Sequence, residues 1–503
     1  ADVHPNDGVT ISMRLVEVHR ANAIAISGTK GGDGFSVLLD ALAKSLRDIA
    51  GNFLLRDIAN IVREHDDDIL PQILGASVNY STGILVLRAS ETIDTTPSSF
   101  VVTADIAVVN VSVGNEYVSM IPLNNAVVTE ADGVLVTIQM TELQRVAAIA
   151  ASSTPGGDGV GAMVDVKINA VRDVATNFVN ATQNVLLNET GDTILPVPQN
   201  ATLNFSTGVL IVRSSETIDT TPVSLVNLTQ IKLANSSGDD TALSGSKIFP
   251  ADSLHVTITL TELQRVKVLA QSNTRGGDGS GVTLDVLHGA FQDIGTNLNP
   301  TRMGLNVNEY PDVVQPRIEH ATIDYNDGVL RIKASETIDT TPASFVNVSS
   351  FRLVNVTQGE GVVLHASQVT EHDHTTFTIK ITETQRAYAI SRSGTSGGDT
   401  HAVTLEVVAG GVLDIGENPC NSALGIIVTE TPDTTRPQPL SAKLNYSTGL
   451  LEVIFDETID TTPSYFRGEM RGMVFPGKFV LYNSSTGAHV RLNNSQLLER
   501  DDT

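Results

Sequence analysis

Histidines, paired carboxylates and glycine-rich loops are the residues of this sequence whose types could carry chemistry. The eleven histidines follow no repeated spacing, and no Gly-x-Ser-x-Gly, His-Glu-x-x-His or phosphate-binding motif occurs. Carboxylate pairs such as Glu91 and Asp94 recur four times. We place them on a surface turn, where a fourfold copy fits a structural role better than acid–base catalysis. We therefore predict no catalytic residue and no enzyme activity.

A second group of carboxylates recurs just before a proline, where we expect linkers. Its members are Glu64, Asp67, Glu189, Asp192, Glu309, Asp312, Glu430 and Asp433. Oxygen ligands at a domain junction are what Ca²⁺ requires, and bound Ca²⁺ would stiffen a linker. The alternative is turn chemistry, in which Asp caps its own backbone. Because no dense Asp-x-Asp-x-Asp loop is present, we favour turn chemistry, keep calcium as the other interpretation, and expect no other cofactor.

Composition limits the class of protein. The chain has 503 residues and a formal net charge of −25, which disfavours a nucleic-acid partner. Apolar residues make up 41%, enough to bury sizeable cores. A single cysteine rules out an internal disulfide framework, and no apolar stretch is long enough for a transmembrane helix.

The chain is built from an internal repeat of about 120 residues. The sequence ETIDTTP starts at Glu91, Glu216, Glu336 and Glu457, at offsets of 125, 120 and 121 residues. Four further blocks keep the same register: TELQR and its variants, GGDG, Asp-x-x-x-Asn, and Glu-x-x-Asp-x-x-x-Pro. Five blocks in one register establish the repeat, and the proline block is the best linker candidate.

Each repeat has the pattern of a β-sandwich. NYSTGILVL, which starts at Asn79, reads as two alternating runs joined by a glycine turn, and GVLVTIQM, which starts at Gly133, alternates with period two. Thr141 and Gln144 fit a capping box that begins one short helix, on which Glu142 and Arg145 could pair. We therefore predict an all-β chain of tandem Ig-like sandwiches, each with one short helix.

The repeat starts and stops in mid-unit. We divide the chain into a back half at 1–65, complete repeats at 66–190, 191–310 and 311–431, and a front half at 432–503. A half sandwich exposes an apolar face and open strand edges. The predicted interface residues are Val9, Ile11, Met13 and Leu15 at one end and Leu451, Val453 and Phe455 at the other.

Three arrangements would cover these faces. The halves could pair between molecules as a head-to-tail filament, pair within one molecule as a ring, or belong to a longer array of which this chain is a window. We favour the filament, because a heterologous contact that does not close produces an open fibre.

Asn-x-Ser/Thr acceptors are frequent and partly in register, which predicts N-linked glycans and hence secretion. They are Asn79, Asn110, Asn180, Asn188, Asn200, Asn204, Asn227, Asn235, Asn347, Asn355, Asn445, Asn483 and Asn493. The alternative is chance, since the chain is rich in Asn, Ser and Thr. The hairpin pattern places Val78 and Tyr80 on one face and Asn79 on the outward one.

The segments VLRIKASETIDTTP, LTELQRVKVLA and GVTLDVLHGAFQDIGTN resemble the Ig-like repeats of large extracellular proteins of algae, other protists and some bacteria. RDIAGN, from Arg47, matches the late turn of such repeats fully, whereas Asp173–Asn177 lacks its glycine. The resemblance covers nearly the whole chain. It implies the β-sandwich fold and a stalk, adhesin or surface fibre, and extends to flagellar-hair or cell-surface filament proteins.

These observations together predict a secreted, glycosylated, non-enzymatic structural protein that polymerises with itself head to tail. It would use neither nucleic acid nor a membrane span. The alternative is an adhesin or stalk segment of a longer repeat protein, which would bind a glycan or protein through its loops.

Overall fold

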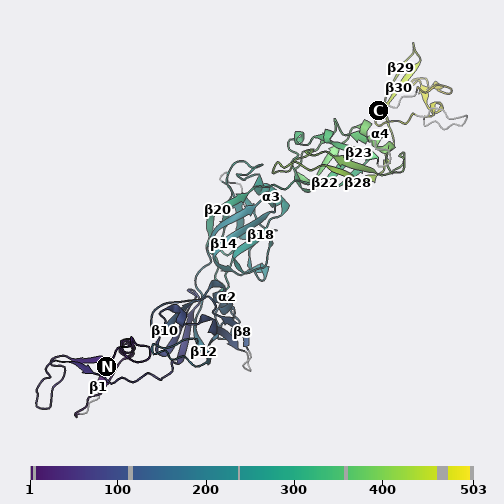
Figure 1. Ribbon diagram of the computed structural model, residues 1–503. Helices are drawn as coiled ribbons and strands as arrows, with labels where there is room; N and C mark the ends of the chain where they lie inside the picture. Colours follow the sequence, from purple (N-terminus) through teal and green to yellow (C-terminus); the bar gives the residue numbers. More distant parts are fainter. Residues whose placement is uncertain are drawn as a thin grey trace.

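A computed structural model describes residues 2–3, 7–111, 117–235, 238, 240–355, 361–461 and 474–498. Three β-sandwich units follow one another along an extended chain, and a shorter segment lies at each end (Figure 1). We name them unit 1 (residues 73–190), unit 2 (198–310) and unit 3 (318–431). The N-terminal half-unit comprises residues 1–65, and the C-terminal half-unit comprises residues 432–503. The predicted fold class is confirmed.

All three units have the same elements in the same order. Unit 1 contains β5 (Ile73–Asn79), β6 (Ile84–Ile93), β7 (Ile106–Val111), β8 (Tyr117–Pro122), β9 (Val127–Val128), β10 (Gly133–Gln139), α2 (Glu142–Ala150), β11 (Met163–Val166) and β12 (Thr182–Thr190). Unit 2 contains β13 (Pro198–Asn204), β14 (Val209–Ile218), β15 (Ile231–Ala234), β16 (Asp240–Ala242), β17 (Lys247–Ile248), β18 (Ser253–Thr259), α3 (Glu262–Leu269), β19 (Thr283–Val286) and β20 (Arg302–Tyr310). Unit 3 contains β21 (Ile318–Asp324), β22 (Val329–Ile338), β23 (Phe351–Asn355), β24 (Gly361–Val363), β25 (Gln368–Val369), β26 (His374–Lys380), α4 (Glu383–Ser391), β27 (Val403–Val407) and β28 (Ala423–Thr431).

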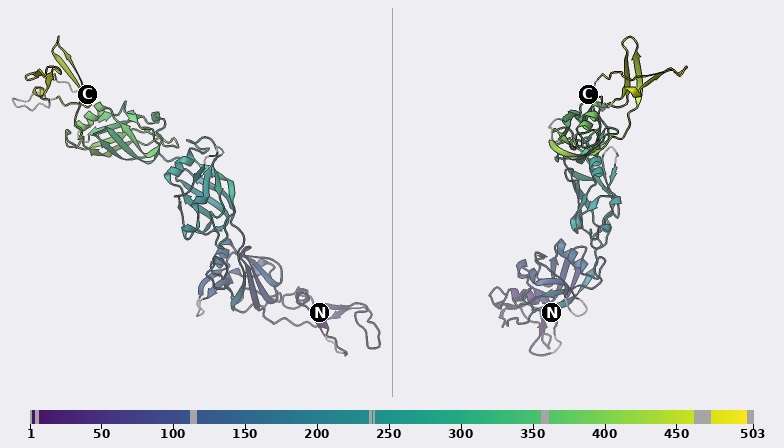
Figure 2. Two further views of the ribbon diagram at one scale, coloured as in Figure 1. Left: turned by 180° about the vertical axis from the view of Figure 1, so that it is seen from behind. Right: turned by 90° about the vertical axis from the view of Figure 1, so that its right-hand side faces the viewer.

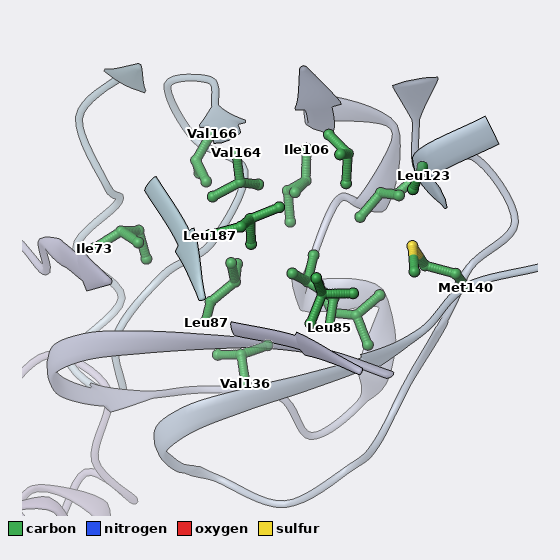
Figure 3. Close-up of a cluster of buried hydrophobic side chains, with 14 of the residues drawn as sticks. Ile73, Leu85, Leu87, Ile106, Leu123, Val136, Met140, Val164, Val166 and Leu187 are labelled. Carbon is green, nitrogen blue, oxygen red and sulfur yellow. The ribbon is translucent and has the colours of Figure 1, made fainter. Parts of the chain in front are cut away.

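The strand order in unit 1 is β8-β7-β11-β12-β5-β6-β10-β9, and units 2 and 3 repeat it. β12 joins the two layers of the sandwich. Its first part pairs antiparallel with β11, and Leu187–Thr190 pairs parallel with Ala76–Asn79 of β5. The two layers enclose a core to which Leu85 and Leu87 contribute from one side and Ile106 and Val164 from the other (Figure 3).

Local sequence accounts for these elements. The predicted hairpin forms from β5 and β6, with Gly83 at a φ of 69° in the turn. Val78 and Tyr80 are buried and Asn79 is half-buried, as the alternation predicts. The capping box is also confirmed, because the Thr141 hydroxyl accepts from the Gln144 N–H and the Gln144 amide accepts from the Thr141 N–H.

The two half-units form only two-stranded sheets among the described residues. The N-terminal half-unit contains β1 (Asp2–Val3), β2 (Met13–Arg14), α1 (Glu17–Ala25), β3 (Leu38–Ala41) and β4 (Asp57–Ile61). The C-terminal half-unit contains β29 (Pro439–Asn445), β30 (Leu450–Phe455), β31 (Val480–Tyr482) and β32 (His489–Arg491). The pairs are β1–β2, β3–β4, β29–β30 and β31–β32.

The two half-units are different parts of the same fold. By repeat register, β1 to β4 and α1 correspond to β9, β10, α2, β11 and β12, and β29 to β32 correspond to β5 to β8. In a complete unit these parts alternate two strands at a time, so that β10 pairs with β6, β11 with β7 and β12 with β5. Neither half-unit can therefore assemble a larger sheet alone, since every further ladder needs a strand from the other.

Among the described residues, no helix has the length and apolar character that crossing a membrane requires.

Candidate functional site

An arginine on the short helix lies at the centre of each junction between units. Arg145 of α2 pairs with Glu142 at 2.7 Å, as the i, i+3 spacing predicts. The same guanidinium donates to Asp192 Oδ2 in the linker at 2.6 Å and to Glu216 Oε2 of unit 2 at 3.0 Å. One side chain thus connects the helix of unit 1, the linker and strand β14 of unit 2.

The arrangement recurs at every position of the repeat. Arg265 contacts Glu262 at 2.7 Å, Asp312 at 2.5 Å and Glu336 at 3.1 Å. The other two networks consist of Arg20 with Glu17, Asp67 and Glu91, and of Arg386 with Glu383, Asp433 and Glu457. The half-units are therefore docked to their neighbouring units by the same contacts as the complete units.

The ETIDTTP motif supplies the side of this junction that belongs to the following unit. The Thr217 N–H donates to Glu142 Oε1 at 3.0 Å, and Thr337 donates to Glu262 in the same way at 2.8 Å. Glu216 is only 6% exposed. Our placement of the motif on a surface turn is therefore wrong: its first residues are buried where two units meet. The shared register of TELQR and ETIDTTP was visible in the sequence, but it does not reveal that Arg145 of one unit contacts Glu216 of the next.

The GGDG loop packs against the next unit by close backbone contact. A Cβ on Gly156 would lie 1.7 Å from the Ile294 carbonyl oxygen of unit 2, and one on Gly276 would lie 1.9 Å from the Ile415 oxygen of unit 3. Both glycines also have a φ above +80°, which disfavours any other residue. Glycine at this position is thus required for the junction as well as for the loop.

The Asp-x-x-x-Asn block is the turn on which that loop rests. Asp293 Oδ1 accepts from the Asn297 N–H at 2.8 Å, and the Asn297 amide donates to the Asp192 carbonyl oxygen at 3.3 Å. Unit 1 forms the same turn without glycine, with Thr176 at a φ of 67° where unit 2 has Thr296 at 69°. The missing glycine in Asp173–Asn177 therefore does not prevent the turn.

The eight linker carboxylates divide into two sets. Four of them accept backbone N–H groups of the loop after the helix: Glu64 from Gly28, Glu189 from Ser153, Glu309 from Asn273 and Glu430 from Gly394. These contacts join the linker to a loop 36 residues away, so they are not the predicted turn chemistry. That chemistry is found in the aspartates, each of which accepts from the N–H two residues further on. The other four, Asp67, Asp192, Asp312 and Asp433, bind the junction arginines.

Three of those aspartates also belong to wholly or largely buried clusters, together with residues that the sequence did not suggest as cation ligands. The clusters are Asp67 with Glu91 and Asp173, Asp192 with Glu216 and Asp293, and Asp312 with Glu336 and Asp414. Burial raises the pKa of Glu216 to about 7, although Arg145 opposes it, and burial raises the pKa of Asp293 to about 6. The cause in both cases is the cost of holding negative charge away from water.

The predicted glycan acceptors differ in accessibility. Asn180, Asn188, Asn200, Asn227, Asn347, Asn445, Asn483 and Asn493 are exposed, and Asn79 and Asn204 are half-buried. Asn110, Asn235 and Asn355 are buried, and their Nδ2 atoms donate to Asp158, Asp278 and Asp399 of the loop after the helix. The prediction of glycans at these three is corrected, because a glycan on Nδ2 would displace that contact.

The predicted interface residues are exposed or half-buried in the half-units, whereas most of their counterparts are buried in complete units. Met13 is 53% exposed and its counterpart Ile138 is fully buried. Ile11 and Leu15 are also exposed, and Leu451, Val453 and Phe455 are half-buried. Their counterparts are Val136, Met140, Leu330, Ile332 and Ala334, all of which are buried. Val9 is the exception, because its counterpart Val134 is 38% exposed.

Comparison with known proteins gives no relative by sequence: no protein-family model matches the chain, and no curated protein does. Among solved structures, the N-terminal part of the bacterial S-layer protein SbsC is 11% identical, over 36% of this chain and 38% of that one, with a TM-score of 0.16. This chain therefore spans well under half of that structure.

Two further solved structures contain immunoglobulin-type domains. The N-terminal four Ig domains of Dscam1 are 12% identical over 75% of this chain and 81% of that one, with a TM-score of 0.14. Extracellular domains 3–5 of Drosophila OTK are 8% identical over 73% and 98%, with a TM-score of 0.17. At such values these likenesses carry no argument about role or partners.

Replacing the junction arginine tests the network. We expect Arg265→Ala to destabilise the contact between units 2 and 3 by about 3–5 kcal/mol, because buried Asp312 and Glu336 lose their cation. Arg275→Ala is the matched control, since it removes the exposed Arg275–Glu417 pair from the same junction and should cost about 1 kcal/mol or less. Urea denaturation of the full chain measures both, and equal losses would contradict this role of Arg265.

Substitutions at two glycines of the same loop distinguish the effect of close packing from that of backbone strain. Gly276 and Gly279 both have a φ of 84°, but only Gly276 approaches the next unit, since a Cβ on Gly279 would meet nothing within 4 Å. Gly279→Ala should cost only about 1–2 kcal/mol of backbone strain. Gly276→Ala should in addition separate units 2 and 3, which small-angle X-ray scattering would detect as a more flexible rod. The same scattering profile for both variants would refute the packing argument.

Proposed function

We propose that this protein is a structural subunit of an extracellular glycoprotein filament. Its copies join head to tail, the C-terminal half-unit of one completing the N-terminal half-unit of the next. The joint is then a full sandwich of the same kind as units 1 to 3, and its buried core holds the copies together.

The alternating strand order carries this proposal. Each half-unit supplies two pairs of strands, and in the complete units such pairs alternate across the sheet. A joined pair would gain three ladders, equivalent to β10–β6, β11–β7 and β12–β5. Isolated two-stranded sheets are marginally stable in water, so these ladders are the strongest reason for the halves to combine.

The repeat register also predicts which side chains meet in the joint. In unit 1, Val136 lies opposite Leu87 and Ile138 opposite Leu85. The corresponding pairs in the joint are Ile11 with Val453 and Met13 with Leu451. All four are apolar, and all four occupy positions that are buried in complete units.

The extended chain favours joining between copies over closure within one. The two half-units lie at opposite ends of the row of units in all three views (Figures 1 and 2). An interface between two different surfaces then propagates from copy to copy and forms an open fibre.

Glycans are the second part of the proposal. Eight acceptor asparagines are exposed, and Asn445 lies on the turn-proximal end of β29. Sugars at these positions would cover the outer surfaces of the units and oppose lateral aggregation of the fibre. The buried acceptors Asn110, Asn235 and Asn355 are excluded from this role.

Charge substitution in the joint tests the filament. We expect Met13→Asp to weaken association at least about 100-fold, because an unpaired carboxylate would be buried opposite Leu451. Thr10→Asp is the control, since its counterpart Leu135 points outward and is exposed. Negative-stain electron microscopy and sedimentation should show long fibres for the parent and Thr10→Asp and short rods for Met13→Asp. Short rods for all three proteins would favour a stalk or adhesin segment instead.

A further inference from the structure

The three carboxylate clusters at the junctions, two of them buried throughout, have the features of cation sites. In each, an aspartate from the linker, a glutamate from the ETIDTTP motif and an aspartate from the Asp-x-x-x-Asn turn offer ligand oxygens within 4.8 Å of one another. The cluster of Asp192, Glu216 and Asp293 is buried at all three residues, and so is that of Asp312, Glu336 and Asp414. These residues are far apart in sequence, so the fold creates the grouping.

A carboxylate oxygen without a partner lies in each of these two clusters. Glu216 Oε2 accepts from Arg145, but Glu216 Oε1 is buried and has no hydrogen-bond donor. In the same way, Glu336 Oε2 accepts from Arg265, and Glu336 Oε1 is buried without a hydrogen-bond donor. Both glutamates are more than nine-tenths buried. A buried, charged oxygen without a donor is costly, and a bound cation would remove that cost.

The charge balance points the same way. At the junction between units 1 and 2, four carboxylates, those of Glu142, Asp192, Glu216 and Asp293, surround the single guanidinium of Arg145. The arginine satisfies the carboxylates of Glu142 and Asp192 and one oxygen of Glu216. The rest of the negative charge has no cation from the described residues around it.

We propose that each of the three clusters binds a hard divalent cation, with Ca²⁺ as the best fit. The available ligands are carboxylate oxygens, with no sulfur or imidazole, which excludes the preferred donors of zinc. Ca²⁺ accepts six to eight oxygens in irregular geometry and takes water for the remainder, whereas Mg²⁺ demands a near-ideal octahedron. A cation bound to Asp192, Glu216 and Asp293 holds the linker against unit 2 while Arg145 holds it against unit 1.

A fourth site follows if the filament exists, and this step rests on the proposed function. Asp433 and Glu457 flank Arg386 as Asp312 and Glu336 flank Arg265. Their missing third partner corresponds in register to Asp48, whose carboxylate accepts, among the described residues, from its own turn alone. Asp48 from the next copy would complete the cluster. A non-assembled chain would then bind three cations and an assembled chain four.

Calcium titration of the full chain tests the sites. The Met13→Asp variant, which does not assemble on the account above, should bind three Ca²⁺ by isothermal titration calorimetry, and its thermal midpoint should rise with CaCl₂ more than with equimolar MgCl₂. Adding Glu216→Gln should lower the stoichiometry to two, as should Glu336→Gln at a different junction. The matched control Glu319→Gln, on an exposed pair with Lys333, should leave it at three.

The outcomes separate the two proposals. Absence of saturable Ca²⁺ binding, or unchanged stoichiometry in both glutamine variants with native circular dichroism, overturns the cation sites and leaves the filament standing. Three sites in Met13→Asp and four in assembled parent protein support both. Three sites in both proteins, with fibres absent by electron microscopy, support the cation sites and contradict the filament.

Discussion

The order of strands within one sandwich is the constraint on which the architecture depends. Because the helix-bearing half of a unit and its other half alternate two strands at a time across the sheet, neither half can extend its strand pairs into a larger sheet by itself. Backbone N–H and C=O groups along the open edges of β2, β3, β4, β29, β30 and β31 therefore have no sheet partners among the described residues. The need to pair these edges is the physical basis of the proposed joint between copies.

The placement of one unit against the next has a different origin, in the charge network at each junction. Arg145 and its counterparts contact three carboxylates that belong to a helix, a linker and the next unit. A buried network of this kind contributes little net stability compared with an apolar contact of the same area, but its geometry fixes one relative placement of the groups. The glycine loop packed on the turn of the next unit adds a steric contact at the same place. Regular orientation between units is what a fibre of defined shape requires.

Much of this was predictable from the sequence because the repeat multiplies each signal. Strand alternation, the Gly83 hairpin turn and the Thr141–Gln144 capping box depend on residues close in sequence, and the structure has all three. The junction was not predictable in detail, since Arg145, Asp192 and Asp293 are distant in sequence and meet only after two units have folded. Burial of Asn110 was missed for the same reason, because its partner Asp158 lies in a loop 48 residues away.

Register in the joint is the most direct test of the central claim that two half-units from different copies interleave. In the double variant Ile11→Cys with Val453→Cys, the two cysteines should lie side by side between neighbouring copies, while the native Cys420 is buried. Oxidation should then yield a ladder of covalent multimers on a non-reducing gel, and the pair Ile11→Cys with Glu452→Cys, on opposite faces, should not. A chain that stays monomeric, cross-links only within itself, or cross-links equally in both variants would contradict the account.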